Sequence, residues 1–458
     1  MKKFFVGLLI LVVIAVAMFW LLPRPKVQQE QIVQQPEPTE TEADQEVVDF
    51  PEPPPGAIVF DMKYRGLGGG PDELRYNSFW GFGSSGESGS TFIEALRKNI
   101  KNLQPVRNRY FKGAEWSAVE LKDNKVVAFY FDLNADGKVS DNEKILPIQT
   151  EAQRTYRHTE FVTPDFIVNT RDGRQVPFRA LLRMAFYGSS SRPQCMWSPS
   201  CILEGTSSID GEPTNLILLT NGFSGSFKDF GRCSYSLLRS AEKFGQYVPR
   251  QTLSSLINHD GQFYHLKLYG SHEKGKRIRA ILEKDTTATG ELAVQLTGDT
   301  SLKGKLSSAS IIGSKDTNIH FSISGDQSKL PAGTYKLSRG YINYGRENDD
   351  QWRVNFTEGP EMTIDPENAC NVELGKPTLS VCAIDAKKRN RSDAKEQSVF
   401  SKGTRIHLSP KIKGKAGELY GRFSQREDNS RRYTDKEPNI RIVDSDHKEV
   451  VTAKMEYG

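Results

Sequence analysis

Most of the chain consists of short apolar runs separated by turn-forming residues. Segments such as "KVVAFYF" (125–131), "NLILLT" (215–220) and "IHFSIS" (319–324) are bounded by Gly, Pro, Asn or Asp. Short runs of this kind, alternating or rich in β-branched and aromatic residues, predict strands rather than helices. We therefore expect a mainly β protein.

Three segments instead carry a helical pattern. A capping box formed by Thr91 and Glu94 precedes residues 92–103, which place apolar side chains on one helical face. Residues 234–245 and 250–258 are two further short helix predictions. All three segments lie between residues 57 and 270, where we expect an α+β domain, and we expect β-sandwich-like domains after it.

Composition divides the chain further. We predict an N-terminal transmembrane helix over 1–22, a disordered linker over 23–56 and the α+β domain over 57–270. A β-sandwich-like domain over 271–368 and a C-terminal β domain over 369–458 complete the expected organisation. A chain of 458 residues is long enough for several domains that each bury a core.

The predicted membrane anchor is a run of nineteen uncharged residues, 4–22, that follows two lysines. A helix that rises about 1.5 Å per residue crosses the hydrocarbon layer with a run of this length. Residues 15–17 (Ala-Val-Ala) also fit a signal-peptidase site, but the apolar run continues past them through Trp20. We predict an uncleaved anchor, and both interpretations place the bulk of the chain in the periplasm or outside the cell.

The predicted linker, 23–56, is rich in Gln, Glu, Thr and Pro, and its eight acidic residues oppose only Arg24 and Lys26. Such a composition buries too little apolar area to fold. Residues 57–458 carry 58 basic and 49 acidic residues, a net charge of +9. This excess of positive charge suits an anionic polymer or a lipid surface. Because the basic residues are interspersed with acidic ones, we expect no nucleic-acid partner.

The stretch "FDLNADGKVSDNE" (131–143) spaces oxygen-bearing side chains at alternate positions. Calcium takes about six to eight hard oxygens, and alternate residues of a tightly curled loop point inward. Gly137 permits the sharp bend of such a loop. The stretch resembles the twelve-residue calcium loop of the EF-hand family, and the resemblance implies a calcium site formed by Asp132, Asn134, Asp136, Lys138, Ser140 and Glu143.

The flanks of the loop depart from that family. Residues 124–131 have the pattern of a strand where the family has its entering helix, and Pro147 ends any following helix within about one turn. The alternative to a metal site is a plain β-hairpin that turns at Asp136-Gly137. That turn leaves the other oxygen donors unexplained, so we predict a strand–loop calcium site of moderate affinity.

A second segment, 218–229, can be aligned with 130–141 so that Gly225 matches Gly137. Its ligand positions hold Thr, Gly and Ser, which cannot retain a divalent cation. The segment is either an internal repeat that has lost its metal or a coincidental Gly/Ser loop.

The five cysteines leave two arrangements open. Cys195 and Cys201 are six residues apart, and Cys370 and Cys382 are twelve apart, so two local disulfides can form and leave Cys233 over. The alternative is five unpaired thiols. The sequence has neither a CxxC motif nor a Cys/His zinc pattern.

Residues 330–337, "LPAGTYKL", resemble the closing strand of carboxypeptidase-regulatory-like or prealbumin-like sandwich modules. In the pattern, a Pro-Ala-Gly turn leads into a strand that places Tyr335 and Leu337 on one face. The resemblance implies a scaffold or adhesion module rather than an active site.

No catalytic motif stands out, and His259, His265 and His272 lack the spacing of a zinc site. We therefore predict a membrane-anchored, calcium-binding protein with a structural or binding role at the cell envelope, whose partner is an envelope polymer or another protein. The alternative is an exported hydrolase that acts on polysaccharide or peptide, and two facing carboxylates in a cleft would favour it.

Overall fold

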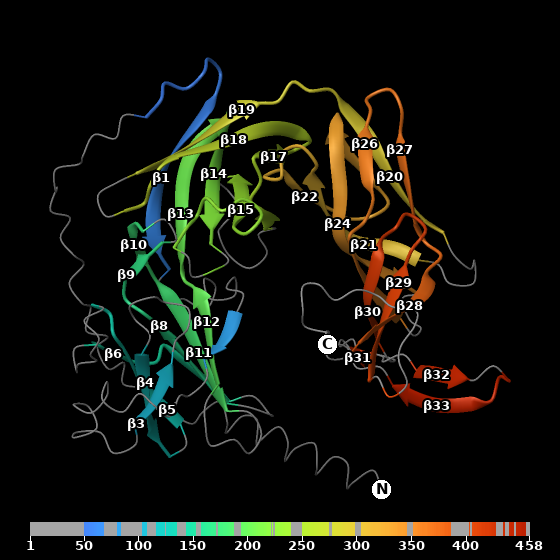
Figure 1. The fold of residues 1–458 in the computed structure, drawn as a ribbon. Helices are drawn as coiled ribbons and strands as arrows, with labels where there is room; N and C mark the ends of the chain where they lie inside the picture. Colours follow the sequence, from blue (N-terminus) through green and yellow to red (C-terminus); the bar gives the residue numbers. More distant parts are fainter. Residues whose placement is uncertain are drawn as a thin grey trace, which may run out of the picture. The chain divides into compact units, whose positions relative to one another are not determined.

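The computed structural model describes residues 50–67, 80–83, 103–107, 116–123, 125–134, 143–152, 157–170, 173–186, 194–220, 222, 225–239, 250–273, 277–297, 304–345, 351–385, 403, 405–426, 434–435, 439–443 and 446–454. Every regular element within these ranges is a β-strand (Figure 1), so the prediction of a mainly β protein is confirmed. No helix in the described part is long and apolar enough to span a membrane. The predicted anchor, 4–22, lies outside these ranges.

The largest sheet within residues 58–284, called the first half below, has the order β16-β15-β14-β13-β1-β19-β18-β17. Its central strand, β1, pairs with β13 through Tyr64–Leu203 and with β19 through Phe60–Ala280, so the sheet joins segments far apart in the chain. The strand bounds are Ile58–Gly66 (β1), Cys201–Ile209 (β13), Glu212–Leu219 (β14), Ser234–Arg239 (β15), Gln251–Thr252 (β16), Leu256–His259 (β17), Gln262–Gly270 (β18) and Ile278–Lys284 (β19).

Three smaller sheets complete the described first half. Their orders are β2-β12-β11-β8-β7, β3-β4-β5-β6 and β10-β9. The strand bounds are Trp80–Gly83 (β2), Leu103–Arg107 (β3), Trp116–Lys122 (β4), Lys125–Phe131 (β5), Lys144–Ile145 (β6), Gln149–Ala152 (β7), Arg157–Val162 (β8), Phe166–Asn169 (β9), Gln175–Phe178 (β10), Ala180–Phe186 (β11) and Gln194–Pro199 (β12).

Two of the three helix predictions are wrong. Residues 234–245 begin with strand β15, and residues 250–258 contain β16 and the start of β17. Strand β15 is buried at nearly every position, so it lacks the alternation that marks a strand in sequence, and its pairing with β14 decides its conformation. The third prediction, 92–103, lies outside the described residues except for Leu103, which opens β3. The described part of 57–270 therefore contains strands and no helix.

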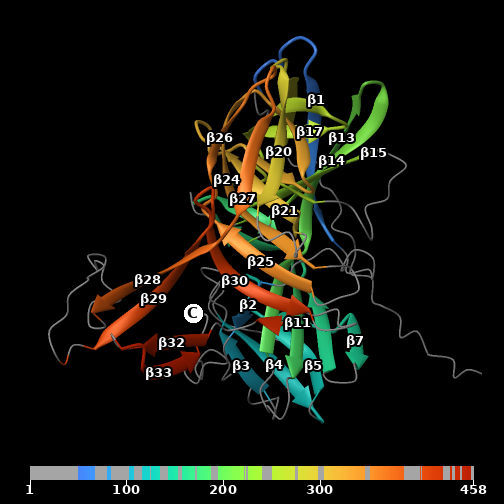
Figure 2. The same ribbon diagram turned by 90° about the vertical axis from the view of Figure 1, so that its right-hand side faces the viewer.

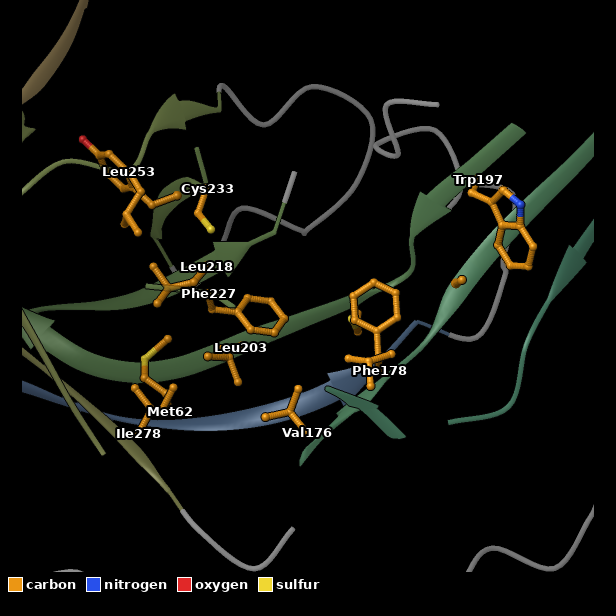
Figure 3. Close-up of a cluster of buried hydrophobic side chains, with 14 of the residues drawn as sticks. Met62, Val176, Phe178, Trp197, Leu203, Leu218, Phe227, Cys233, Leu253 and Ile278 are labelled. Carbon is orange, nitrogen blue, oxygen red and sulfur yellow. The ribbon is translucent and has the colours of Figure 1, made fainter. Parts of the chain in front are cut away.

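One buried cluster joins these sheets (Figure 3). It combines Phe60 and Met62 of β1, Phe129 of β5 and Trp197 of β12 with side chains of the neighbouring strands and loops. Trp197 has no exposed surface, and its ring centroid lies 5.6 Å from that of Phe129. Stacking of this ring on a carbohydrate is therefore excluded, because both of its faces are covered by protein.

The remaining described residues, 289–454, called the second half below, contain two sheets and one separate hairpin. One has the order β23-β20-β27, with β20 and β27 parallel, and the other has the order β22-β21-β24-β25-β30-β29-β28, with β26 added to β24 and β31 to β30. A second buried cluster draws on both sheets, for example through Leu292 of β20 and Leu337 of β24. The strand bounds are Thr289–Thr297 (β20), Gly304–Gly313 (β21), His320–Ile323 (β22), Gln327–Pro331 (β23), Gly333–Tyr344 (β24), Gln351–Thr357 (β25), Glu361–Ile364 (β26), Cys370–Gly375 (β27), Thr378–Asp385 (β28), Ile406–Lys413 (β29), Leu419–Arg426 (β30) and Thr434–Asp435 (β31). A separate hairpin pairs Asn439–Val443 (β32) with Glu449–Lys454 (β33).

The segment "LPAGTYKL" has the local geometry that its pattern predicts. The chain leaves β23 at Pro331 and enters β24 at Gly333, and it thereby passes from one sheet to the other. Tyr335 and Leu337 are both buried, and the Tyr335 hydroxyl donates to the Pro331 carbonyl at 3.0 Å. This bond fastens the crossing between the sheets, while the family resemblance stays a prediction.

Two sheets combine strands from both sides of a predicted domain boundary. Strand β19 follows residue 270 but pairs with β1 and β18, and β27 follows residue 368 but pairs with β20. At the other end, the guanidinium of Arg279 lies 4.5 Å from the ring centroid of Phe50, a residue of the predicted linker. The structure therefore describes the last residues of that linker, 50–56, and Phe50 contacts the first sheet.

Candidate metal centre

The predicted calcium loop connects two antiparallel strands. Strand β5 ends at Phe131, strand β6 begins at Lys144, and the two pair through Phe129–Ile145 and Tyr130–Lys144. The alternating residues 125–131 thus form a strand, as predicted for the flank that departs from the EF-hand family. The twelve residues between the strands begin and end at the same edge of this small sheet.

The first and last predicted ligands are both buried at that edge. Asp132 is 1% exposed and Glu143 is 5% exposed. Carboxylates this deeply buried are rare in proteins unless they are paired or coordinate a metal. Both lie at the ends of the predicted loop, at the positions of its first and last predicted ligands.

Glu143 also closes the loop onto itself. The backbone N–H groups of Leu133 and Asn134 donate to Glu143 Oε1 at 2.8 and 3.3 Å. These bonds hold the carboxyl group beside the residue that follows Asp132, so residues 132 and 143 approach as a twelve-residue cage requires.

The ladder between β5 and β6 argues against a plain tight hairpin. Strand pairing stops at Tyr130–Lys144, and the described residues 132–134 are not strand. In a tight hairpin at Asp136-Gly137, backbone pairing would run on towards the turn. Here a side-chain carboxylate takes up the first loop amides instead.

The base of the loop is anchored in the first core. Phe131, which directly precedes Asp132, is fully buried, and its ring centroid lies 5.4 Å from that of Trp197 and 5.0 Å from that of Phe166. Rigid aromatic packing of this kind fixes the direction in which the chain leaves β5. The first residue of the loop therefore directly follows a side chain that is packed in the core.

The side chain of Lys144, which directly follows the loop, pairs with an acid outside the loop. Lys144 Nζ lies 3.3 Å from Glu120 Oε2, and the hydroxyl of Tyr130 donates to the same oxygen at 3.1 Å. Burial raises the pKa of Tyr130, so this hydroxyl keeps its proton at neutral pH. Lys144 thus neutralises an acid on strand β4.

The remaining predicted ligands divide between described and undescribed residues. Asn134 is exposed, while Asp136, Lys138 and Ser140 lie outside the described residues. Within the described ranges no group of three or more His, Cys, Asp or Glu side chains is placed to hold a metal ion. The structure thus brings Glu143 to the first residues of the loop, and the complete ligand set stays a prediction.

The second loop has a different local structure. The hydroxyl of Thr220, at the first ligand position, donates to the carbonyl of Gly222 at 3.0 Å. Gly225 has φ +67°, and a Cβ at this residue would lie 2.6 Å from Val176 Cγ2, so only glycine fits here. This loop packs on the core and provides no carboxylate at the positions that match Asp132 and Asn134.

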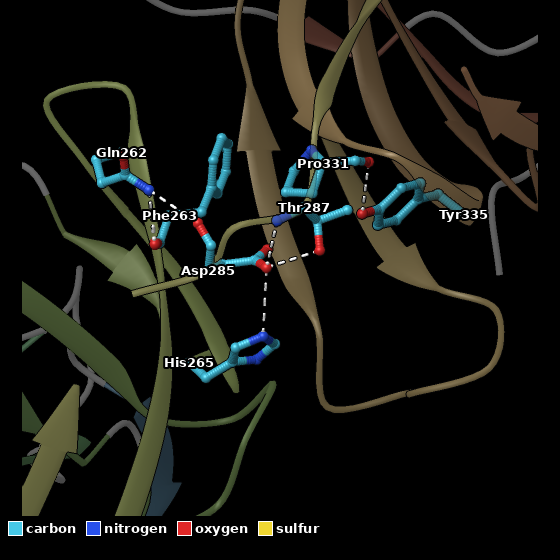
Figure 4. Close-up of polar contacts among 7 residues, drawn as sticks. All are labelled: Gln262, Phe263, His265, Asp285, Thr287, Pro331 and Tyr335. Atoms are coloured by element: carbon cyan, nitrogen blue, oxygen red, sulfur yellow. Dashed lines mark hydrogen bonds and ion pairs between the residues drawn. The ribbon is translucent and has the colours of Figure 1, made fainter. Parts of the chain in front are cut away.

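The three histidines do not form one site. His265 Nε2 lies 3.6 Å from Asp285 Oδ1, and the hydroxyl of Thr287 donates to the same oxygen at 2.7 Å (Figure 4). In a hydrolase triad the histidine stands between the nucleophile and the acid. Here the acid stands between the other two, so the histidine cannot take the proton of the Thr287 hydroxyl.

His272 is the buried histidine of the described chain. It is 7% exposed, its ring contacts that of Phe227, and its Nε2 has no hydrogen-bond partner among the described residues. Burial lowers the pKa of His272 to about 4, and the positive charge of Lys228 acts in the same direction. The backbone of Gly225 and the charge of Glu273 oppose the shift.

Acidification should therefore destabilise the protein through His272. The pKa of an unfolded histidine is about 6.5. Between about pH 6.5 and 4 the unfolded state therefore binds one more proton than the folded state, and stability decreases as the pH is lowered. We expect a loss of about 2 kcal/mol between about pH 7.5 and 5 that His272→Gln removes. Urea unfolding of both chains across this range measures it, and equal pH profiles would contradict it.

The described cysteines are free thiols. Cys195, Cys201 and Cys233 are buried and Cys370 is partly buried, while the side chain of Cys382 lies outside the described part. The Cys195–Cys201 disulfide is therefore not formed. Burial raises the pKa of Cys201 to about 12, so its thiol stays protonated and unreactive.

Other buried carboxylates were not apparent from the sequence. Glu160 is 2% exposed and pairs with Arg183 across strands β8 and β11, and Glu418 has no exposed surface. The partner of Glu160, Arg183, and one partner of Glu418, the N–H of Gly375, lie on distant strands, so local sequence does not show these contacts. Both bind protein groups and so act as structural residues.

The described molecule is thus a mainly β protein with a candidate strand–loop metal centre. No protein-family model, curated protein or solved structure matches the chain. Its function must therefore be argued from its own residues.

Proposed function

We propose that this protein is a membrane-anchored, extracytoplasmic calcium-binding protein with a structural or binding role at the cell envelope. The observation that supports it most is the pair of buried acids, Asp132 and Glu143, at the two ends of a twelve-residue loop. Asn134, Asp136 and Ser140 supply further oxygens of the EF-hand pattern, and Lys138 supplies its carbonyl.

The ion would act mainly on stability. Several carboxylates around one loop repel each other in the absence of a cation, and the loop leaves a strand whose aromatic side chains pack in the core. Calcium would remove this repulsion and hold β5 against β6. A structural ion fits a β-rich scaffold better than a signalling role, for which a bistable element would be required.

The location rests on the sequence. Residues 4–22 form the anchor, and the acidic linker carries the folded part away from the membrane. The second core cluster lies between two sheets, which supports β-sandwich-like domains of the scaffold or adhesion type in the second half. An envelope polymer or another protein is the proposed partner.

Calcium titration of the full chain tests the site. Isolated extracellular calcium modules bind at about 10⁻⁴ to 10⁻³ M, so about 10 mM calcium should stabilise the fold by about 1.5 to 3 kcal/mol. Asp132→Ala should abolish this stabilisation. Glu143→Gln should weaken it, because the amide oxygen still accepts from the loop N–H groups but carries no charge.

Asp123→Asn provides the matched control. Asp123 lies in the turn between β4 and β5, at φ +50°, a conformation that Asn also adopts. This variant should keep the full calcium response, measured by calorimetry and by thermal unfolding. If a chelator leaves the unfolding of the natural chain unchanged, the calcium proposal is wrong.

A further inference from the structure

The nine-stranded sheet of the second half has one face in the core and one face directed away from it. Leu306, Leu337 and Phe356 place the first face in the second buried cluster. Strand β25 lies between β24 and β30 (Figure 2), and β21 pairs with the other edge of β24. Because successive residues of a strand point to opposite faces, the residues that alternate with the buried ones form the outer face.

Four neighbouring strands of this sheet contain no acidic residue. Asp and Glu make up 57 of the 458 residues of the chain, yet none occurs in β21, β24, β25 or β30. No residue of these strands therefore neutralises their basic side chains, which are Lys305, Lys336, Arg339, Arg353, Arg422 and Arg426.

The register gathers part of this charge into one patch. Directly opposed residues of antiparallel strands share a face. Nine residues of β21, β24 and β25, called the basic patch below, form three rows across the outer face: Ser310–Arg339–Thr357, Ser308–Tyr341–Asn355 and Lys305–Asn343–Arg353.

The positive charge of the patch is accessible. Lys305 and Arg339 are exposed, and neither forms an ion pair with a carboxylate in the part of the chain that the structure describes. Arg353 is held in place by its neighbours, because its Nε donates to Asn343 Oδ1 at 3.2 Å and its guanidinium lies 5.9 Å from the ring centroid of Tyr341. The patch therefore carries positive charge in both of its outer rows.

The spacing of these rows favours a polymer over a single small anion. Arg339 and Asn343 are four residues apart on β24, which is about 13 Å along a strand. Cations in both rows can pair with successive negative groups of one polymer, whereas a small anion reaches only one row. Between them lie Tyr341, which is 43% exposed, and the hydrogen-bonding side chains of Ser308 and Asn355.

We propose that the basic patch binds an anionic polysaccharide. Arg339 pairs with a negative group of the polymer in one outer row, and Lys305 and Arg353 pair with a second group in the other. The ring of Tyr341 stacks on a sugar between them, and the hydroxyl and amide side chains bond to sugar hydroxyls. The inference rests on the proposed envelope role, because it names the polymer partner, and it uses none of the calcium ligands.

Other anionic partners fit the patch less well. A lipid surface takes up large apolar side chains, and Tyr341 is the one exposed large apolar side chain among the nine residues. Single-stranded nucleic acid stacks successive bases on several aromatic rings, which one tyrosine does not provide. A second copy of the chain would bring two basic patches together in a symmetric contact.

Calorimetric titration of the full chain, in a neutral detergent, with hyaluronan fragments tests the proposal. Hyaluronan carries a carboxylate on every second sugar and should bind, whereas uncharged dextran should not. A chelator is present throughout, so the calcium loop takes no part. High salt should weaken the binding, because it screens exposed charges. Equal binding of dextran, or equal binding of poly-glutamate, overturns the proposal.

Two variants and a control locate the binding. The double variant Lys305→Glu with Arg339→Glu should weaken hyaluronan binding about tenfold. Tyr341→Ala should also weaken it, but should keep its salt dependence. Lys122→Glu with Lys125→Glu makes the same change in net charge at two exposed lysines of β4 and β5, and it should bind like the natural chain.

Equal weakening in the two double variants would contradict the proposal, since it would mean that net charge alone governs binding. Thermal unfolding of each variant separates lost binding from lost folding. None of the substitutions touches a calcium ligand, so a failure here leaves the calcium stabilisation to be judged by its own titration.

Discussion

Replacing Glu418 by alanine is expected to lower the free energy of unfolding by about 3 to 5 kcal/mol. The carboxylate has no exposed surface, and three donors converge on it. Oε1 accepts from the Gly375 N–H at 2.8 Å and from the Tyr420 hydroxyl at 2.7 Å, and Oε2 accepts from the Ala416 N–H at 3.0 Å. The substitution leaves all three donors without this acceptor, two of them in buried bonds.

Glu418 joins parts of the second half that are distant in sequence. Gly375 ends β27 in one sheet, while Ala416 and Tyr420 belong to the turn and strand that follow β29 in the other. Urea unfolding should therefore show a large decrease in the free energy of unfolding of Glu418→Ala. Glu373→Ala is the matched control, because its carboxyl is 42% exposed and pairs with Lys415 at the surface, where an ion pair contributes little to stability. Similar losses in both variants would mean that Glu418 does not connect the two sheets.

The second large effect is expected from Trp197→Ala, which should cost about 3 to 5 kcal/mol because the cavity it leaves cannot close. The indole is fully buried and contacts the rings of Phe129 and Phe131 at the base of the calcium loop. The loss of these contacts frees the end of β5. The variant should therefore also bind calcium more weakly than the natural chain.

Trp197→Phe and Trp352→Ala are the comparisons for this variant. The first keeps an aromatic ring and should lose less than half as much stability, and the second removes a Trp from β25 that is only partly buried. Chemical denaturation followed by circular dichroism measures all three. Unchanged calcium affinity in Trp197→Ala would show that the loop is independent of the core.

The parts of the candidate loop that the structure describes are local. The strand before the loop and the position of Glu143 beside the first loop residues both depend on residues close in sequence. The bonds from the amides of Leu133 and Asn134 to Glu143 were not predictable, since the EF-hand pattern assigns that carboxylate to the ion.

The two wrong helix predictions fall on segments where burial or shortness removes the alternation of apolar and polar residues that marks a strand. Strand β15 has apolar residues on both faces, so its sequence fits a short helix as well as a strand. Pairing of Leu216 with Leu237 and its neighbours provides backbone partners from β14, and this tertiary contribution outweighs the local preference. Strands β16 and β17 are too short to establish a period at all.

By itself, the sequence determined that this is a mainly β chain and that one loop spaces oxygen donors at alternate positions, because strand alternation and loop spacing are properties of neighbouring residues. Only the tertiary structure decided that β1 lies between β13 and β19, that Glu418 connects two sheets and that Leu379 of β28 and Ile406 of β29 stay exposed. Those features depend on which distant strands pair, and pairing is set by the burial of the whole core rather than by any local segment.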